Sequence, residues 1–191
     1  MEKDRNEKIV AGLERISEVF KTLLWEKAKA HGISPIQIQL LLFVANHKPE
    51  LCSVSHLAKE FNLTKPTISD AVKMLVKKGF LEKDFSSADS RSYTLFVSQS
   101  GKELLDKLDN YYQPLSSELS KLGSEELGNL YSTLTKLIYQ LNRSGIIQVQ
   151  RTCYGCRYYE KKSKASYCHL LQSDLEEEEI RLDCPEFEEK M

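Results

Sequence analysis

Several features that mark specialised proteins are scarce in this sequence. No apolar run reaches the ~18 residues that a transmembrane helix needs, so no membrane partner is expected. The first ten residues, MEKDRNEKIV, are rich in charge, unlike a secretory signal. Cysteine occurs only once, as Cys52, before residue 153. We therefore expect a cytoplasmic protein whose thiols stay reduced.

A strong net charge is also absent. The 191 residues carry 27 Lys and Arg against 28 Asp and Glu, which gives −1. The balance is uneven, however: residues 1–145 carry 20 basic and 18 acidic side chains (+2), and residues 146–191 carry 7 and 10 (−3). The first part is thus the one able to approach a polyanion. The length fits one domain with an appendage, or two small domains.

Apolar residues recur every three or four positions at both ends of the first 145 residues, which predicts long helices. One covers the first 30 residues and ends at His31 and Gly32. Two more follow residue 100, where Ser100 and Glu103 form a capping box, and Pro114 is expected to kink or break the first of them. These helices carry more leucine than a winged helix can cover, so we expect residues 1–32 and 100–145 to form a dimer interface.

Along residues 33–99 the spacing of the apolar residues changes from the period of helices to that of strands. Ser34, Pro35 and Gln37 open an apolar helix, and two shorter helices follow at 53–61 and 65–78, separated by the turn NLT. The segments FLEKDF and YTLFVS then predict two strands joined by the polar connector SSADSRS. This order predicts a winged helix-turn-helix, and a mainly α fold with a small β-hairpin. The second helix is expected to bury Ile68, Val72, Leu75 and Val76 and to leave its polar residues, including Lys65, to face DNA.

The segment SVSHLAKEFNLTKPTISDAVKMLVKKGFLEKDFSSADSRSYTLFVSQSGKELL resembles the DNA-binding lobe of MarR-type transcriptional regulators. The resemblance covers roughly residues 5–145. It implies that Asp89 holds Arg91 in the hairpin tip and that Arg91 touches DNA. Where such regulators often have Arg this chain has Lys83, and Ser90 replaces a basic residue, which suggests a weaker wing contact. The predicted DNA-contacting residues are Lys65, Thr67, Ser69, Asp70, Lys73, Lys83, Asp89 and Arg91.

The resemblance also implies how such a protein works. It implies a homodimer that binds a double-stranded DNA operator, and we expect a repressor. A small-molecule effector would bind between the dimer helices and the DNA lobes, where Trp25, His31 and Phe43 could line a pocket. For each of these three side chains, plain core packing is the favoured alternative.

Four cysteines gather in residues 146–191 with the spacing Cys153-x2-Cys156-x11-Cys168-x15-Cys184. A Cys-x2-Cys turn lets two thiolates grip one ion, and a unit of about 40 residues rarely folds without a metal, disulfide or partner. We expect a metal site, with His169 as an alternative ligand to Cys168. The aromatic residues expected to cluster around it are Tyr154, Tyr158, Tyr159, Tyr167 and Phe187. Zinc is favoured over a [4Fe–4S] cluster, although the Cys184-Pro185 step is typical of cluster ligation. Cys52 reads as a small buried residue.

Three other functions can be weighed from the sequence. A cluster in place of zinc would make the protein a redox- or iron-sensing regulator. A thiol oxidoreductase would use Cys153 and Cys156, but no thioredoxin-like βαβ pattern surrounds them. There is also no Ser-His-Asp order, phosphate loop or HExxH motif, so we expect no enzyme. The cysteine-rich segment could also recruit a partner protein.

Overall fold

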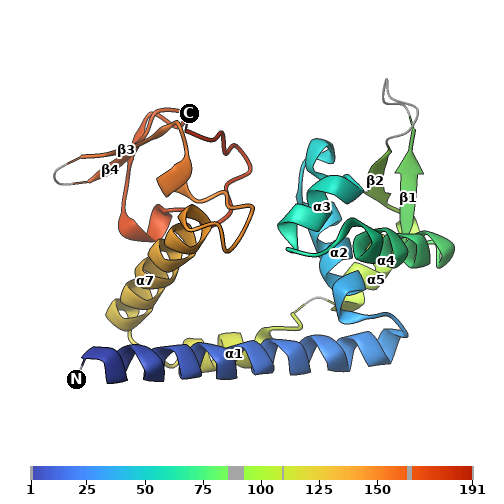
Figure 1. Cartoon of the computed structure of the whole chain (residues 1–191), viewed down its shortest axis with the longest axis horizontal. Helices are drawn as coiled ribbons and strands as arrows, with labels where there is room; N and C mark the ends of the chain where they lie inside the picture. Colours follow the sequence, from blue (N-terminus) through green and yellow to red (C-terminus); the bar gives the residue numbers. More distant parts are fainter. Residues whose placement is uncertain (1, 86–92, 109, 163–164, 191) are drawn as a thin grey trace. The chain divides into compact units, whose positions relative to one another are not determined.

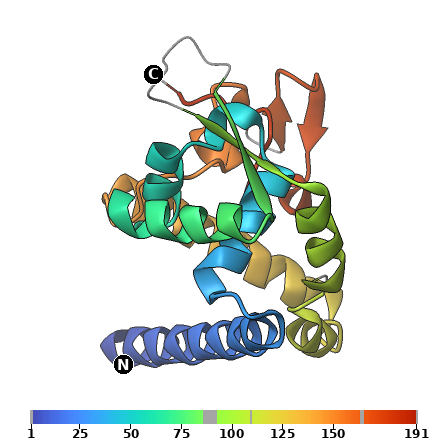
Figure 2. The same cartoon turned by 90° about the vertical axis from the view of Figure 1, so that its right-hand side faces the viewer.

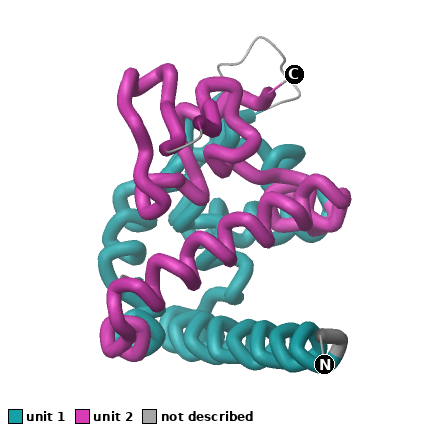
Figure 3. The backbone as a smooth tube through the Cα atoms, turned by 90° about the vertical axis from the view of Figure 1, so that its left-hand side faces the viewer, with its two compact units in different colours: residues 1–57, 65–117 teal, residues 58–64, 118–191 magenta. Residues whose placement is uncertain are grey.

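A computed structural model describes residues 2–85, 93–108, 110–162 and 165–190 (Figure 1). The chain forms two compact units, one of residues 1–57 and 65–117 and the other of residues 58–64 and 118–191 (Figure 3). None of the described helices has the length and apolar character that crossing a membrane requires. The fold is mainly helical with a small β-hairpin, as predicted.

The first unit begins with α1 (Glu2–His31) and α2 (Pro35–Asn46). Helix α2 is the centre of the core: Ile38, Leu40 and Leu41 have no exposed surface. Its predicted capping box is present, because the Ser34 N–H donates to Gln37 Oε1 at 2.9 Å. Helix α1 behaves differently, since every described side chain from 4 to 22 is exposed and only its last turns pack on α2.

The helix-turn-helix follows after the short 3₁₀ helix η1 (Pro49–Leu51). Helix α3 (Val54–Glu60) is capped by Ser53, whose Oγ accepts the His56 N–H at 3.2 Å. Helix α4 (Lys65–Lys77) buries Ile68, Ala71, Val72 and Leu75; Ala71 takes the place predicted for Val76, which is only half-buried. Gly79 ends this segment with φ of 76°, a backbone conformation that glycine adopts without strain.

The hairpin pairs β1 (Leu81–Asp84) with β2 (Thr94–Val97) in antiparallel register, and β1 lies against α4 (Figures 1 and 2). Leu81 and Leu95 point into the core, where each is 1% exposed. The Leu95 N–H also donates to the Cys52 carbonyl at 3.0 Å, which ties the wing to the segment before α3. The tip of the predicted wing, with Asp89, Ser90 and Arg91, lies outside the described residues.

Helices α5 (Gln99–Leu108) and α6 (Gln113–Leu119) are separate, which agrees with the break predicted at Pro114. The predicted cap of α5 was wrong by two residues. The Gly101 N–H donates to Ser98 Oγ at 3.0 Å, and Ser100 Oγ instead donates to the Gly79 carbonyl at 2.6 Å. Ser98 is therefore the capping residue.

The second unit contains α7 (Ser124–Arg143), the linker 144–152, and residues 153–190, called the cysteine lobe below. The lobe contains η2 (Cys153–Gly155), β3 (Tyr159–Lys161), β4 (Ser166–Cys168), β5 (Ser173–Leu175) and η3 (Glu177–Glu179). The three strands form one antiparallel sheet in chain order, which the sequence did not predict because each is only three residues long. The lobe packs on the side of α7 that bears Ser132 and Thr135, and the Tyr131 hydroxyl donates to the Ile180 carbonyl at 2.6 Å.

The leucine stripe of α7 is only partly covered. Leu130 and Leu137 are 41% and 38% exposed, whereas Ser132 and Thr135 on another side of the same helix are buried. The cysteine lobe thus covers the small polar residues of α7 rather than its leucines.

Candidate nucleic-acid interface and cysteine site

Helix α4 presents one polar surface to solvent. Lys65, Thr67, Ser69, Asp70, Lys73 and Lys77 are all exposed. The opposite side is anchored, because Ile68, Val72 and Leu75 have no exposed surface. Gln37 Nε2 also donates to the Ala71 carbonyl at 3.5 Å, and Lys78 Nζ donates to the Gly32 carbonyl. A firmly packed helix with a solvent-exposed polar face has the form that enters a major groove.

The base of the wing carries a cation next to an aromatic ring. Lys83 is exposed on β1, and its Nζ lies 4.1 Å from the centre of the Tyr93 ring. Phe85, which is 57% exposed, has its ring 5.5 Å from that of Tyr93. The predicted pair Asp89 and Arg91 lies outside the described residues, so Lys83 is the predicted wing contact that the structure places.

The turn between α3 and α4 is closed by two backbone hydrogen bonds. The Asn62 N–H donates to the Lys59 carbonyl at 3.2 Å, and the Leu63 N–H donates to the Ala58 carbonyl at 2.9 Å. This is the Schellman pattern, and Asn62 takes the left-handed position with φ of 51°. Asparagine is one of the few residues other than glycine that adopts this conformation at modest cost.

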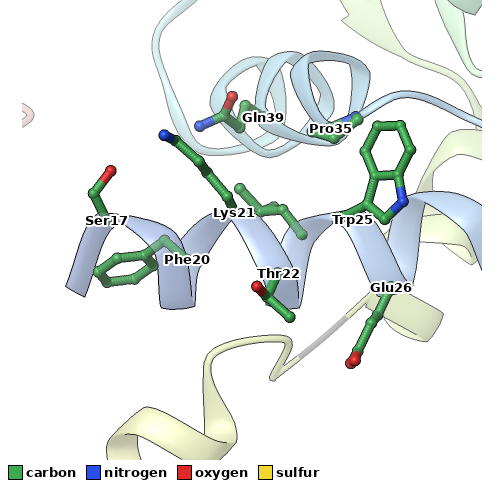
Figure 4. Close-up of a pocket in the computed structure, with 9 residues that line it drawn as sticks. Ser17, Phe20, Lys21, Thr22, Trp25, Glu26, Pro35 and Gln39 are labelled. Carbon is green, nitrogen blue, oxygen red and sulfur yellow. The ribbon is translucent and has the colours of Figure 1, made fainter. Parts of the chain in front are cut away.

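An open groove of about 800 Å³ lies between α1 and α2 (Figure 4). Phe20, Thr22 and Trp25 line it from α1, and Pro35 and Gln39 line it from α2. Two of the side chains predicted for an effector pocket, His31 and Phe43, do not line this groove. Phe43 is buried and stacks on the His47 ring with 3.7 Å between ring centres, which is the core-packing alternative.

The four cysteines of the lobe are free thiols; Cys153 and Cys156 belong to its small core, and Cys168 packs against that core. Cys153, Cys168 and Cys184 line a cavity of about 40 Å³ together with Leu170, Leu171 and Leu175. Cys153 and Cys156 are buried, and Cys168 and Cys184 are half-buried. Burial raises the pKa of the Cys153 thiol, and the neighbouring Cys184, Cys156 and Cys168 raise it further. A thiol in this setting is neutral unless a cation compensates its charge.

Two polar groups lie beside Cys153. The Arg181 N–H donates to Cys153 Sγ at 3.2 Å, a contact that favours a thiolate. Thr152 Oγ1 is buried and has no hydrogen-bond partner among the described residues. The four cysteine thiols are donors of the kind that soft metal ions prefer. Within the described ranges, no group of three or more Cys, His, Asp or Glu side chains is placed to hold one ion. The zinc and iron–sulfur expectations thus gain no direct support.

The aromatic surroundings match the sequence prediction except at Tyr167. Tyr154, Tyr158 and Phe187 pack on the core formed by Cys153, Cys156, Tyr159, Leu175 and Ile180. Tyr167 instead contacts His169, with ring centres 5.0 Å apart. His169 Nε2 lies 2.9 Å from Glu160 Oε2, so His169 is engaged by a carboxylate and does not line the cavity with the cysteines.

Cys52 is buried in the first unit, where 1% of it is exposed. Its Sγ donates to the Lys48 carbonyl at 3.4 Å. Burial raises the pKa of the Cys52 thiol to about 11, so almost none of it is thiolate near neutral pH. The interpretation of Cys52 as a small core residue fits this environment.

Sequence reasoning missed one polar cluster in the second unit. The Arg151 guanidinium bonds Glu60 through Nη1 and Nη2, at 2.8 and 3.0 Å, and bonds Asp183 through Nε at 2.5 Å. Burial alone would lower the Arg151 pKa, but the bonds to Glu60 and Asp183 outweigh it and leave the pKa raised. Arg151 precedes Cys153 by two residues and Asp183 directly precedes Cys184, which is the only local signal for this cluster.

The first part of the chain is similar to known transcriptional regulators. Residues 31–92 match the model of the MarR family. The chain is similar to the HTH-type transcriptional repressor YetL of Bacillus subtilis (strain 168), with 26% identity over 112 residues, 54% of this chain and 67% of YetL. YetL is named a transcriptional repressor, which is the class of protein that the sequence predicts for this chain.

Solved structures share the fold. The MepR–DNA complex of S. aureus has a TM-score of 0.61 and 22% identity, covering 69% of this chain and 97% of MepR. A MarR transcriptional regulator from Methanosarcina mazei Go1 has a TM-score of 0.62 and 19% identity, covering 74% of this chain and 99% of that protein. The winged helix-turn-helix architecture predicted for this chain is therefore confirmed.

Proposed function

We propose that this chain, whose residues 31–92 match the MarR family, is a DNA-binding transcriptional regulator that acts as a homodimer. The observation that carries the proposal is the polar surface of α4, exposed on a helix whose other side is fully buried. The similar MepR was solved with DNA bound, and the similar YetL is named a repressor. Repression is accordingly the direction we propose.

The homodimer is supported by apolar surface that the single chain leaves uncovered. Ile9, Leu13, Ile16 and Phe20 follow one side of α1 and are between 37% and 53% exposed. Monomeric proteins rarely expose continuous apolar patches of this kind. A symmetric pair would cover them and would present two α4 helices to a pseudo-palindromic duplex. A small apolar effector would bind in the groove beside Trp25 and Phe20.

Lys65→Ala tests the DNA contact. Each phosphate contact contributes about −0.9 to the slope of log affinity against log salt. Because a dimer carries two copies of Lys65, the variant should bind a mixed-sequence duplex more weakly, with a slope flatter by up to about 1.8. Lys107→Ala is the matched control, since Lys107 is an exposed lysine on α5, away from α4. Equal affinity and slope for Lys65→Ala and the wild type would refute this docking mode.

A second element of the proposal is one zinc ion held by Cys153, Cys156, Cys168 and Cys184. Its support is that Cys153, Cys168 and Cys184 line one small cavity, that Cys156 lies with Cys153 in the core of the lobe, and that an amide N–H is directed at Cys153. A cavity of about 40 Å³ has room for one or a few water-sized spheres, which suits a single ion better than a four-iron cluster. A closed four-thiolate zinc site stabilises a fold and has no open position for catalysis.

A further inference from the structure

The linker 144–152 contacts the turn of the helix-turn-helix, and both belong to the second compact unit (Figure 3). Gln148 Nε2 donates to Asn62 Oδ1 at 3.2 Å. Arg151 holds both oxygens of Glu60, at 2.8 and 3.0 Å. Glu60 is the last residue of α3, and Asn62 is the left-handed residue of the turn. Two side chains of the linker therefore grip the segment that leads directly into α4 at Lys65.

Arg151 is equally well attached to the cysteine lobe. Its guanidinium bonds Asp183 Oδ1 at 2.5 Å, and its carbonyl accepts the Cys184 N–H at 3.0 Å. On the other side, the Cys153 N–H donates to the Arg181 carbonyl at 3.1 Å. The chain segments that bear Cys153 and Cys184 thus run next to each other, with Arg151 at their junction. An ion bound by both thiols would hold these two segments together and would fix Arg151.

The Arg151–Glu60 ion pair is more shielded from solvent than a surface ion pair of the cysteine lobe. The side chains of Arg151 and Glu60 are 10% and 17% exposed, and two carboxylates surround the guanidinium. By comparison, the side chains of Arg157 and Glu188 are 53% and 50% exposed. A shielded arginine that bonds both oxygens of a carboxylate holds that carboxylate in place, because its planar guanidinium fixes both the distance and the orientation between the two groups. An exposed pair such as Arg157 and Glu188 contributes little and constrains little.

We propose that Arg151 is a positioning residue that couples metal binding in the cysteine lobe to the order of the turn 61–64, and through it to α4. With metal bound, Arg151 is held between Asp183 and Glu60, and the two hydrogen bonds that close the turn are stabilised. Without metal, the segments around Cys153 and Cys184 separate, Arg151 no longer holds Glu60 in place, and the turn opens more often. The inference rests on the proposed zinc site.

Hydrogen exchange of the full-length protein measures this coupling without DNA. The amides to follow are Asn62 and Leu63, whose N–H groups close the turn. Coupling free energies between sites usually correspond to factors of about 5–150, so chelation of the wild-type zinc should speed exchange at these amides by a factor in that range. In Glu60→Gln the exchange should already be fast with zinc bound, and chelation should change it no further.

Two variants serve as controls. Glu188→Gln removes the exposed carboxylate partner of Arg157 and should leave the response of the turn to chelation as large as in the wild type. Arg151→Lys keeps the charge but loses the bidentate fork, so its response should be partly restored relative to Arg151→Gln. Bound zinc, measured by elemental analysis, should remain near the wild-type amount in Glu60→Gln, which separates loss of coupling from loss of the site.

Each outcome has a distinct meaning. A wild-type protein that binds zinc but shows the same turn exchange after chelation overturns the coupling alone. A protein that binds no zinc overturns the metal site and the coupling with it. If chelation opens the turn while Lys65→Ala leaves DNA affinity unchanged, the coupling stands and the proposed DNA contact fails. If the zinc site, the coupling and the DNA contact all hold, chelated wild type and zinc-bound Glu60→Gln should both bind a mixed-sequence duplex more weakly than zinc-bound wild type, by similar factors.

Discussion

Leu13→Glu should dissociate the proposed homodimer, because Leu13 lies in the middle of the uncovered apolar side of α1. Full burial of a leucine side chain is worth about 1.5–3 kcal/mol. Since 39% of Leu13 is exposed, covering that part in a dimer contributes roughly 0.6–1.2 kcal/mol per copy. A two-fold interface contains the residue twice, so the loss is roughly 1.2–2.4 kcal/mol, or about 8- to 60-fold in the dissociation constant. Burying two carboxylates adds a further penalty.

Sedimentation equilibrium over a range of concentrations measures this change. The wild type should be a dimer. Leu13→Glu should raise the dissociation constant of the dimer by at least the factor estimated above from the lost burial of leucine. Met74→Glu is the matched control: Met74 is 41% exposed but lies on α4, so its variant should remain a dimer. An unchanged dissociation constant for Leu13→Glu, with native helix content by circular dichroism, would refute the assignment of α1 to the interface.

Two further predictions concern packing and metal. A Cβ at Gly101 would lie 2.7 Å from Val97 Cγ1 and closer still to the Phe80 carbonyl, so Gly101→Ala should lower the unfolding free energy by about 1–3 kcal/mol in urea titrations. Gly128→Ala, where the nearest atom is Glu178 Oε1 at 3.4 Å, should instead raise it by up to about 1 kcal/mol; equal effects would contradict the packing at Gly101. Protein purified without oxygen should be colourless, with about one zinc per chain; Cys153→Ser should lose it and Cys52→Ser should keep it. A brown protein with iron and sulfide would replace zinc by a cluster.

The winged helix was predictable because each of its elements has a strong local signal. The Gln37 capping box, the glycine at the end of α4 and the buried stripe at Ile68, Val72 and Leu75 all occur where the sequence places them. The errors were errors of choice between near neighbours. Ser98 and Ser100 both precede α5, and the close approach of Gly101 to the wing, which no sequence pattern shows, selects Ser98 as the cap.

The cysteine lobe was less predictable for a physical reason. Its strands are three residues long, so no alternation of apolar and polar residues can develop along them. The spacing of the cysteines indicated a compact lobe, and the aromatic residues Tyr154 and Phe187 were correctly expected to pack on it. The link from Arg151 to Glu60 joins residues 91 positions apart. A contact at that separation follows from the folded path of the chain and leaves no trace in a local pattern.

In the proposed homodimer, helix α7 would have two neighbours at once. Its Ser132 and Thr135 side is covered by the cysteine lobe of the same chain, and Leu130 and Leu137 on another side stay exposed for a second copy. Adding or deleting one residue in an α-helix turns everything beyond it by about 100°. Such a change near the middle of α7 would turn Thr135 and Leu137, which follow it, away from the sides that Ser132 and Leu130, which precede it, still occupy. Its length is therefore constrained by rotation as much as by reach, and substitutions should be far better tolerated there than insertions.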